Sequence, residues 1–155
     1  MATVRCYLPL SVRQLEALSR DRHLRGPLDA FAVTEAVRAA NPAGVEDEWE
    51  YAALQQAARG QAEAGQPILI AAIDLAKADV TRDDKAVSAS VHIGDLDLPR
   101  VASLHLGDDV VAGQAGVLEA GTVQVGSAIE LSWYDTTELD HVVELAQASS
   151  PPAKA

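Results

Sequence analysis

The stretch that most constrains the fold is Pro67–Leu75, PILIAAIDL, an almost unbroken apolar run of strand length. A strand with one wet face alternates apolar and polar residues, whereas a strand covered on both faces is apolar throughout. The run is far shorter than the roughly 18 apolar residues of a membrane-spanning helix. The sequence therefore predicts a central strand of a sheet, with protein packed against both of its faces.

A strand that leads directly into a helix is predicted near the end of the sequence, over residues 129–147. Ile129, Leu131 and Trp133 alternate with polar residues, which indicates a strand with these three side chains on its buried face. Asp135 and Glu138 have the spacing of a capping box, and the apolar residues that follow recur every three or four positions. We therefore expect a capped amphipathic helix after the strand.

The same patterns predict the other elements. Strands are expected at 3–10, 30–33, 86–93 and 101–106, and helices at 12–20, 35–40, 46–64 and 108–119. The chain of 155 residues is long enough to bury one core. We predict a single α+β domain over residues 1–148, in the order β-α-β-α-α-β-β-β-α-β-α, with a flexible tail at 149–155. We expect a mixed sheet of about six strands with helices mainly on one face.

The formal net charge of −11 limits the possible partners. Binding to nucleic acid or to an anionic membrane depends on Lys and Arg, so neither partner is expected. Cys6 is the single cysteine, which excludes a disulfide framework and a cysteine-based metal cluster. The first residues lack the basic and apolar regions of a signal peptide, and a cytoplasmic location is predicted.

No motif of a known catalytic or nucleotide-binding class occurs in the sequence. The catalytic residues, if the chain is an enzyme, are therefore unknown; we predict no cofactor and no metal, and lean against an enzyme. The pattern His-x-Gly-Asp does occur twice, at His92 and at His105. If their strands form a hairpin, the histidines lie about four residues, or ~13 Å, apart. We interpret them as separate surface histidines, each followed by a turn.

Three charged clusters are weaker candidates. Glu46 and Glu50 share one face at the start of the predicted helix 46–64 and are candidate partner or cation ligands, although helix starts also collect acids for electrostatic reasons alone. Glu138 and His141 have the spacing of carboxylate-bridged metal sites, but the second copy such a site needs is missing, which favours a surface pair. The arginines of 13–25 could hold a phosphate or complement a helix dipole.

Polar side chains occupy the non-core positions of several predicted strands: Arg5, Tyr7, Ser88, Ser90, His92, Ser103, His105, Glu130, Ser132 and Tyr134. If these strands share a sheet, one of its faces is polar. Such a face is wet, binds a partner, or is covered by a further helix layer. Since the net charge disfavours RNA, a protein is the favoured partner, and Tyr7, Tyr134 and Asp135 are candidate binding residues.

Three parts of the sequence resemble a family of small uncharacterised proteins of unknown function from high-GC actinobacteria. They are VRCYLPLSVRQLEAL at the start, the pair FAVTEAVR and EDEWEYAALQQAA, and LPRVASLHL followed by IELSWYDTTEL. The resemblance spans nearly the whole chain. The family has no established activity, cofactor or catalytic residue, so the resemblance implies none for this chain.

Three functional hypotheses follow. The first is a cytoplasmic interaction or regulatory protein that binds a macromolecular partner through the polar sheet face or the acidic helix start. The second is a small enzyme or ligand-binding domain with its site at the C-terminal ends of strands, near Asp74, Asp108, Tyr134 and Asp135. The third is an acidic mimic of nucleic acid. A compact pocket with a carboxylate of raised pKa would favour the second hypothesis.

Overall fold

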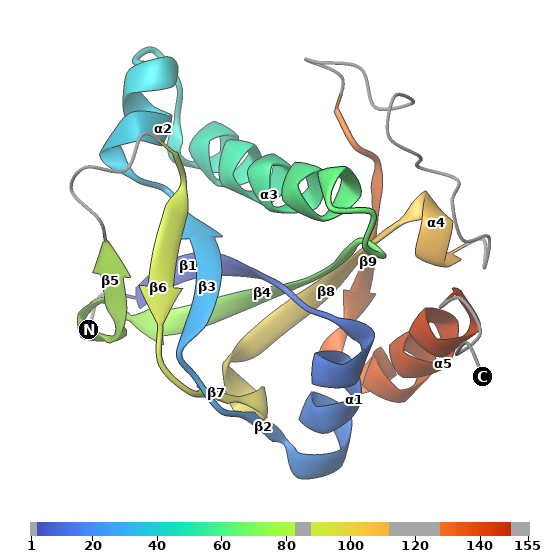
Figure 1. Ribbon diagram of the computed structural model, residues 1–155. Coiled ribbons are helices and arrows are strands. Elements are labelled where there is room, and N and C mark those ends of the chain that lie inside the picture. The colour runs from blue at the N-terminus through green and yellow to red at the C-terminus, as the bar shows by residue number, and fades with distance from the viewer. Residues whose placement is uncertain (1–2, 83–87, 112–127, 150–155) are drawn as a thin grey trace.

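The computed structural model describes residues 3–82, 88–111 and 128–149 and centres on one antiparallel sheet (Figure 1). The seven strands lie in the order β5-β6-β3-β1-β4-β8-β9. Their bounds are β1 Thr3–Pro9, β3 Leu28–Ala32, β4 Leu69–Ala76, β5 Val80–Arg82, β6 Ser90–Ile93, β8 Val101–Gly107 and β9 Leu131–Asp135. A separate two-stranded sheet pairs β2 (His23–Leu24) with β7 (Leu96–Asp97).

The helices cover both faces of the large sheet. They are α1 Val12–Asp21, α2 Glu35–Ala40, α3 Glu46–Glu63, α4 Asp108–Val111 and α5 Leu139–Ser149, with short 3₁₀ turns η1 Lys77–Asp79, η2 Leu98–Arg100 and η3 Thr136–Glu138. Apolar residues of α1, α4 and α5 share one buried cluster with one face of the sheet. Those of α2 and α3 share a second cluster with the other face (Figure 1).

The central strand behaves as its composition predicts. Leu69, Ala71 and Ile73 of β4 belong to the cluster under α1 and α5. Ile70 and Ala72 belong to the cluster under α3. Because successive side chains of a strand point to opposite faces, an unbroken apolar run serves two cores at once. The prediction of a single α+β domain with a doubly covered central strand is confirmed.

Two details of the predicted fold are wrong. The sheet is antiparallel rather than mixed, and the helices lie on both faces rather than mainly on one. The connection from β3 through α2 and α3 to β4 does join two strands of the same direction. However, β1 lies between them and pairs antiparallel with each, so no parallel neighbours arise.

The expected hairpin between the two histidine-bearing strands is also absent. β6 pairs with β3 and β5, whereas β8 pairs with β4 and β9, so three strands separate His92 from His105. The short strands β2, β5 and β7 lie in segments for which the sequence predicts no strand. A strand of two or three residues is too short to show an alternating pattern of apolar and polar residues. The predicted residues 86–87, 112–119 and 150–155 lie outside the described ones.

Trp133 corrects the expected orientation of the last strand. Its side chain is 61% exposed, while Tyr134 packs against the cluster under α1 and α5. β9 is an edge strand with α5 against one side only, and both residues of the pair are aromatic, so alternation alone does not reveal which one faces the core. The predicted cap is confirmed, because Asp135 N donates to Glu138 Oε2 over 3.0 Å.

Candidate functional site

A polar cleft of about 420 Å³ opens between the start of α3 and the region where β4 leads through η1 into β5. Side chains from six elements bring their charges to it: Arg5, Arg38, Glu46, Glu50, Asp74, Lys77 and Arg82. Glu46 and Glu50 are four residues apart on α3 and therefore share one helix face, as the sequence predicts. Asp74 lies near the C-terminal end of β4, where a ligand site was expected.

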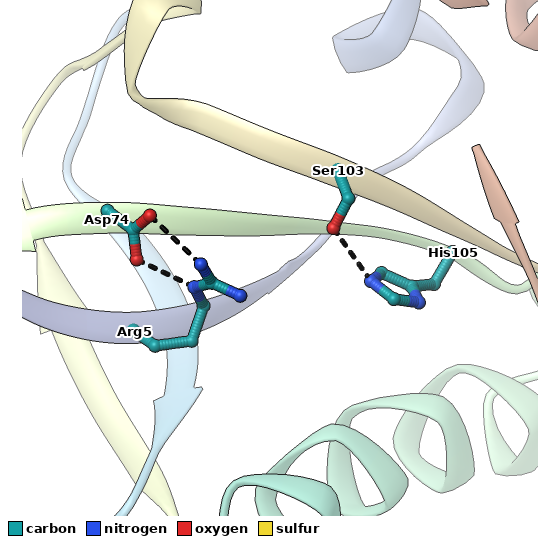
Figure 2. A network of polar contacts seen from close by, with 4 residues as sticks. All are labelled: Arg5, Asp74, Ser103 and His105. Carbon is teal, nitrogen blue, oxygen red and sulfur yellow. Dashed lines mark hydrogen bonds and ion pairs between the residues drawn. The ribbon is translucent and has the colours of Figure 1, made fainter. Parts of the chain in front are cut away.

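An ion pair forms part of the cleft wall. Arg5 of β1 lies directly opposite Asp74 of β4 in the sheet register. Its Nε and Nη2 donate to the two carboxylate oxygens of Asp74 over 2.6 and 3.0 Å (Figure 2). This hydrogen bond is the main reason that the pKa of Arg5 is raised. Such a two-point pair fixes both side chains, so neither charge is free to move far.

Glu50 carries the shifted carboxyl group of the cleft. Partial burial raises its pKa above the ordinary value, and the negative charges of Glu46, Asp47 and Asp74 add to the effect, while Arg5 opposes it. A carboxylate in this position lacks a compensating partner, since no hydrogen bond or ion pair joins it to another described residue. A cationic group brought into the cleft would remove that deficit.

The cations of the cleft differ in how they are held. Arg38 Nη1 lies 3.2 Å from Glu35 Oε1, and its guanidinium stacks over the Trp49 ring at 5.6 Å. Lys77 and Arg82 form no ion pair with any residue in the described ranges. The cleft thus holds two anions, Glu46 and Glu50, and two cations, Lys77 and Arg82, that are not neutralised by described neighbours.

A serine and a histidine meet on the same side of the sheet. Ser103 Oγ and His105 Nε2, two residues apart on β8, lie 3.0 Å from each other (Figure 2). Burial, followed by the charge of Arg5, lowers the pKa of His105, so the ring is neutral near pH 7. Ser103 is only 5% exposed, and no described side chain orients the second ring nitrogen. A nucleophile needs both access and an oriented base, so we interpret the pair as structural.

An apolar groove of about 510 Å³ lies on the opposite flank of α3, between this helix and β9. α3 packs over β1, β3 and β4, and the groove lies beside the helix, at β8 and β9. The rings of Tyr51 and Trp133 border the groove and are 52% and 61% exposed. Its two walls are about eighty residues apart in the chain, so no local sequence pattern predicts it.

The structure separates the remaining predicted site residues. Tyr7 is 6% exposed beneath α3, and burial raises its pKa to about 12. Tyr134 lies on the opposite face, with its ring 6.2 Å from that of His141. Asp135 accepts hydrogen bonds from Thr137, which lower its pKa. Of the five candidates, Glu46 and Glu50 are the two that line the polar cleft.

The predicted polar face is partly correct. Arg5, Tyr7, Ser103 and His105 do share one face, and α3 covers much of it, which is one of the three outcomes considered. Ser132 and Tyr134 lie on the other face, because they pair with Leu106 and Leu104. Much of this face is therefore internal, and the cleft and the groove are two of its open parts.

The other clusters have local partners. His23 lies between two carboxylates, with Nδ1 2.6 Å from Asp97 and Nε2 3.2 Å from Asp95, and this arrangement raises the pKa of the ring. Its partners are more than seventy residues away, so the sequence gives no signal for it. His92 lies 2.8 Å from Asp29. Within the described ranges, no three His, Cys, Asp or Glu side chains converge as metal ligands.

Comparison with known proteins gives a family and no activity. No curated protein matches the sequence. No solved structure matches it either. In the described part of the chain, no helix has the length and apolar character needed to cross a bilayer. The model of a family of unknown function, DUF6912, matches residues 4–143. This match covers most of the chain, which therefore belongs to that family.

Proposed function

We propose that the chain is a ligand-binding domain whose polar cleft holds a small molecule with both an ammonium group and an acidic group. One observation carries this proposal. Two carboxylates and two cations line one cleft without neutralising one another or being neutralised by described neighbours. A ligand with opposite charges at its two ends fits both pairs at once, as an amino acid or a short peptide does.

The electrostatics of Glu50 support the orientation of such a ligand. Partial burial and the neighbouring negative charges raise its pKa, so the ionised carboxylate is poorly compensated by the residues around it. A ligand ammonium beside Glu46 and Glu50 would stabilise the ionised form, and the acidic end would then face Lys77 and Arg82. The Arg5–Asp74 pair is already neutral and serves as a fixed wall. Binding is thus favourable because the ligand supplies the opposite charges that the carboxylates and the cations of the cleft lack.

The test is a calorimetric titration with amino acids and dipeptides, beside an amine and a carboxylic acid that each carry one charge only. Zwitterions should bind more tightly than either single-charge compound. Glu50→Gln and Lys77→Met should each weaken binding by about tenfold, or ~1.4 kcal/mol.

Matched controls separate the cleft from general charge effects. Glu63→Gln removes the same charge from the exposed far end of α3, and Arg13→Met removes a cation from the exposed side of α1. Both should leave binding unchanged. No binding by any zwitterion, or equal losses in the control variants, would refute the proposed function.

A further inference from the structure

The groove beside β9 exposes two large aromatic side chains at one place. Tyr51 and Trp133 both border it, and both are more than half exposed. A third exposed hydrophobic residue, Val45, lies outside the groove at the N-cap of α3. Trp and Tyr are the residues that most often carry the binding energy of protein interfaces. Their coincidence in one groove indicates a surface for a partner rather than scattered exposure.

The charges around the groove are negative. Glu130 lines it directly. Asp47 and Glu48, both exposed, precede Tyr51 by four and three residues and therefore lie on its side of α3. No Lys or Arg among the described residues lines the groove, and His105 is neutral there because burial lowers its pKa. Together with the net charge of −11, this surface complements a basic partner.

The wall of the groove is fixed before any partner arrives. The buried side chain of Gln55 accepts from Ile129 N over 2.7 Å and donates to Ile129 O over 2.9 Å. This pair of bonds ties the segment before β9 to α3. A pre-formed groove avoids part of the entropic cost of ordering a binding surface.

We propose that this groove docks a segment of a partner protein in which Lys or Arg side chains alternate with apolar ones. The apolar side chains contact Leu54 and Ile129 in the groove. The cations lie against the faces of Tyr51 and Trp133, where aromatic rings attract positive charge, and near Glu130 at the rim. The site is separate from the polar cleft and does not depend on the ligand proposed for it.

The experiment measures the fluorescence anisotropy of a short dye-labelled peptide of alternating Leu and Lys. Two matched peptides replace Lys by Glu or Leu by Ser. The Leu–Lys peptide should bind most tightly, and Trp133→Ser should weaken its binding by about tenfold or more. Val45→Ser, which removes an exposed hydrophobic residue outside the groove, should bind like the wild type. The exposed position of Trp133 predicts an unchanged melting temperature for Trp133→Ser. Val45→Ser should melt at the same or a slightly higher temperature, because Val45 is the N-cap of α3 and serine is a favoured N-cap residue.

Four outcomes would overturn the proposal. Equal binding by wild type and Trp133→Ser would show that net charge alone attracts the peptide. If the Leu–Glu peptide binds as tightly as the Leu–Lys peptide, the acidic rim does not contribute to binding. A dimer that Trp133→Ser dissociates, without peptide binding, would assign the groove to a second copy of the chain. If none of the three peptides binds, the proposal that the groove takes a basic and apolar segment would be refuted.

Discussion

The two flanks of α3 present opposite chemistries from neighbouring residues. Glu50 lines the polar cleft, whereas Tyr51 borders the apolar groove. Consecutive residues of an α-helix are about 100° apart around its axis, so one helix can line two sites. The cleft collects charges from six elements, while the groove is formed mainly by α3 and the segment leading into β9. The comparison shows how a single helix across a sheet face creates two separate openings.

The largest expected effect is on the wall of the groove. Gln55→Leu leaves the N–H and C=O of Ile129 without their partners in a buried position, and we expect a loss of about 2 kcal/mol in the free energy of unfolding. Peptide binding at the groove should fall as well, while ligand binding at the cleft is retained. Chemical denaturation measures the first effect and anisotropy the second. A stability equal to that of the wild type would show that the two bonds do not hold this wall.

A smaller effect is expected at the wall of the cleft. Asp74→Ala leaves Arg5 without its paired carboxylate and should cost about 1 kcal/mol of stability, because both side chains are partly exposed and solvent screens the pair. Ligand binding should weaken, since Arg5 becomes free to turn toward Glu50. Peptide binding at the groove is the internal control. A variant in which both sites fail together would break the separation of the two flanks.

The smallest stability effect is expected for Glu50→Gln, and unlike the two preceding variants it should stabilise the fold near pH 7. The pKa of this carboxyl is raised in the folded state above its ordinary 4.5, so its ionisation is less favourable in the folded chain than in the unfolded one. Stability relative to Glu50→Gln is therefore highest below pH 4.5 and is lost as the pH rises through the folded pKa. Near pH 7 the variant should be more stable by a few tenths of a kcal/mol at most, since the group is only partly buried.

Thermal unfolding of wild type and Glu50→Gln between about pH 4 and pH 7 measures this difference. Glu63→Gln should show no comparable trend. A difference that favours the wild type more strongly with rising pH would contradict the cause assigned to the shift.

Local patterns in the sequence account for most of the fold. The apolar run of β4 predicts its double coverage, and Asp135 with Glu138 predicts the start of the last helical segment, because each depends on residues close in the chain. Glu46 and Glu50 were identified for the same reason. The face of the sheet to which Trp133 points cannot be predicted in this way, since it depends on which side of β9 the helix α5 occupies.

The sites required long-range information. Arg5 meets Asp74 only because β1 and β4 are neighbours, a pairing that their compositions do not specify. Lys77 and Arg82 line the cleft from η1 and β5, which are too short to show a periodic pattern in the sequence. The groove depends on Gln55 reaching Ile129 across 74 residues. Strand order therefore limits what the sequence alone predicts of function.

The most direct test of the account measures both kinds of binding on the same two variants. Glu50→Gln should lose affinity for a zwitterionic ligand and keep affinity for the Leu–Lys peptide. Trp133→Ser should lose affinity for the peptide and keep affinity for the zwitterion. Each variant should lose one affinity and keep the other, because the two sites on the flanks of α3 are independent. Loss of both affinities in either variant, or of neither in both, would contradict it.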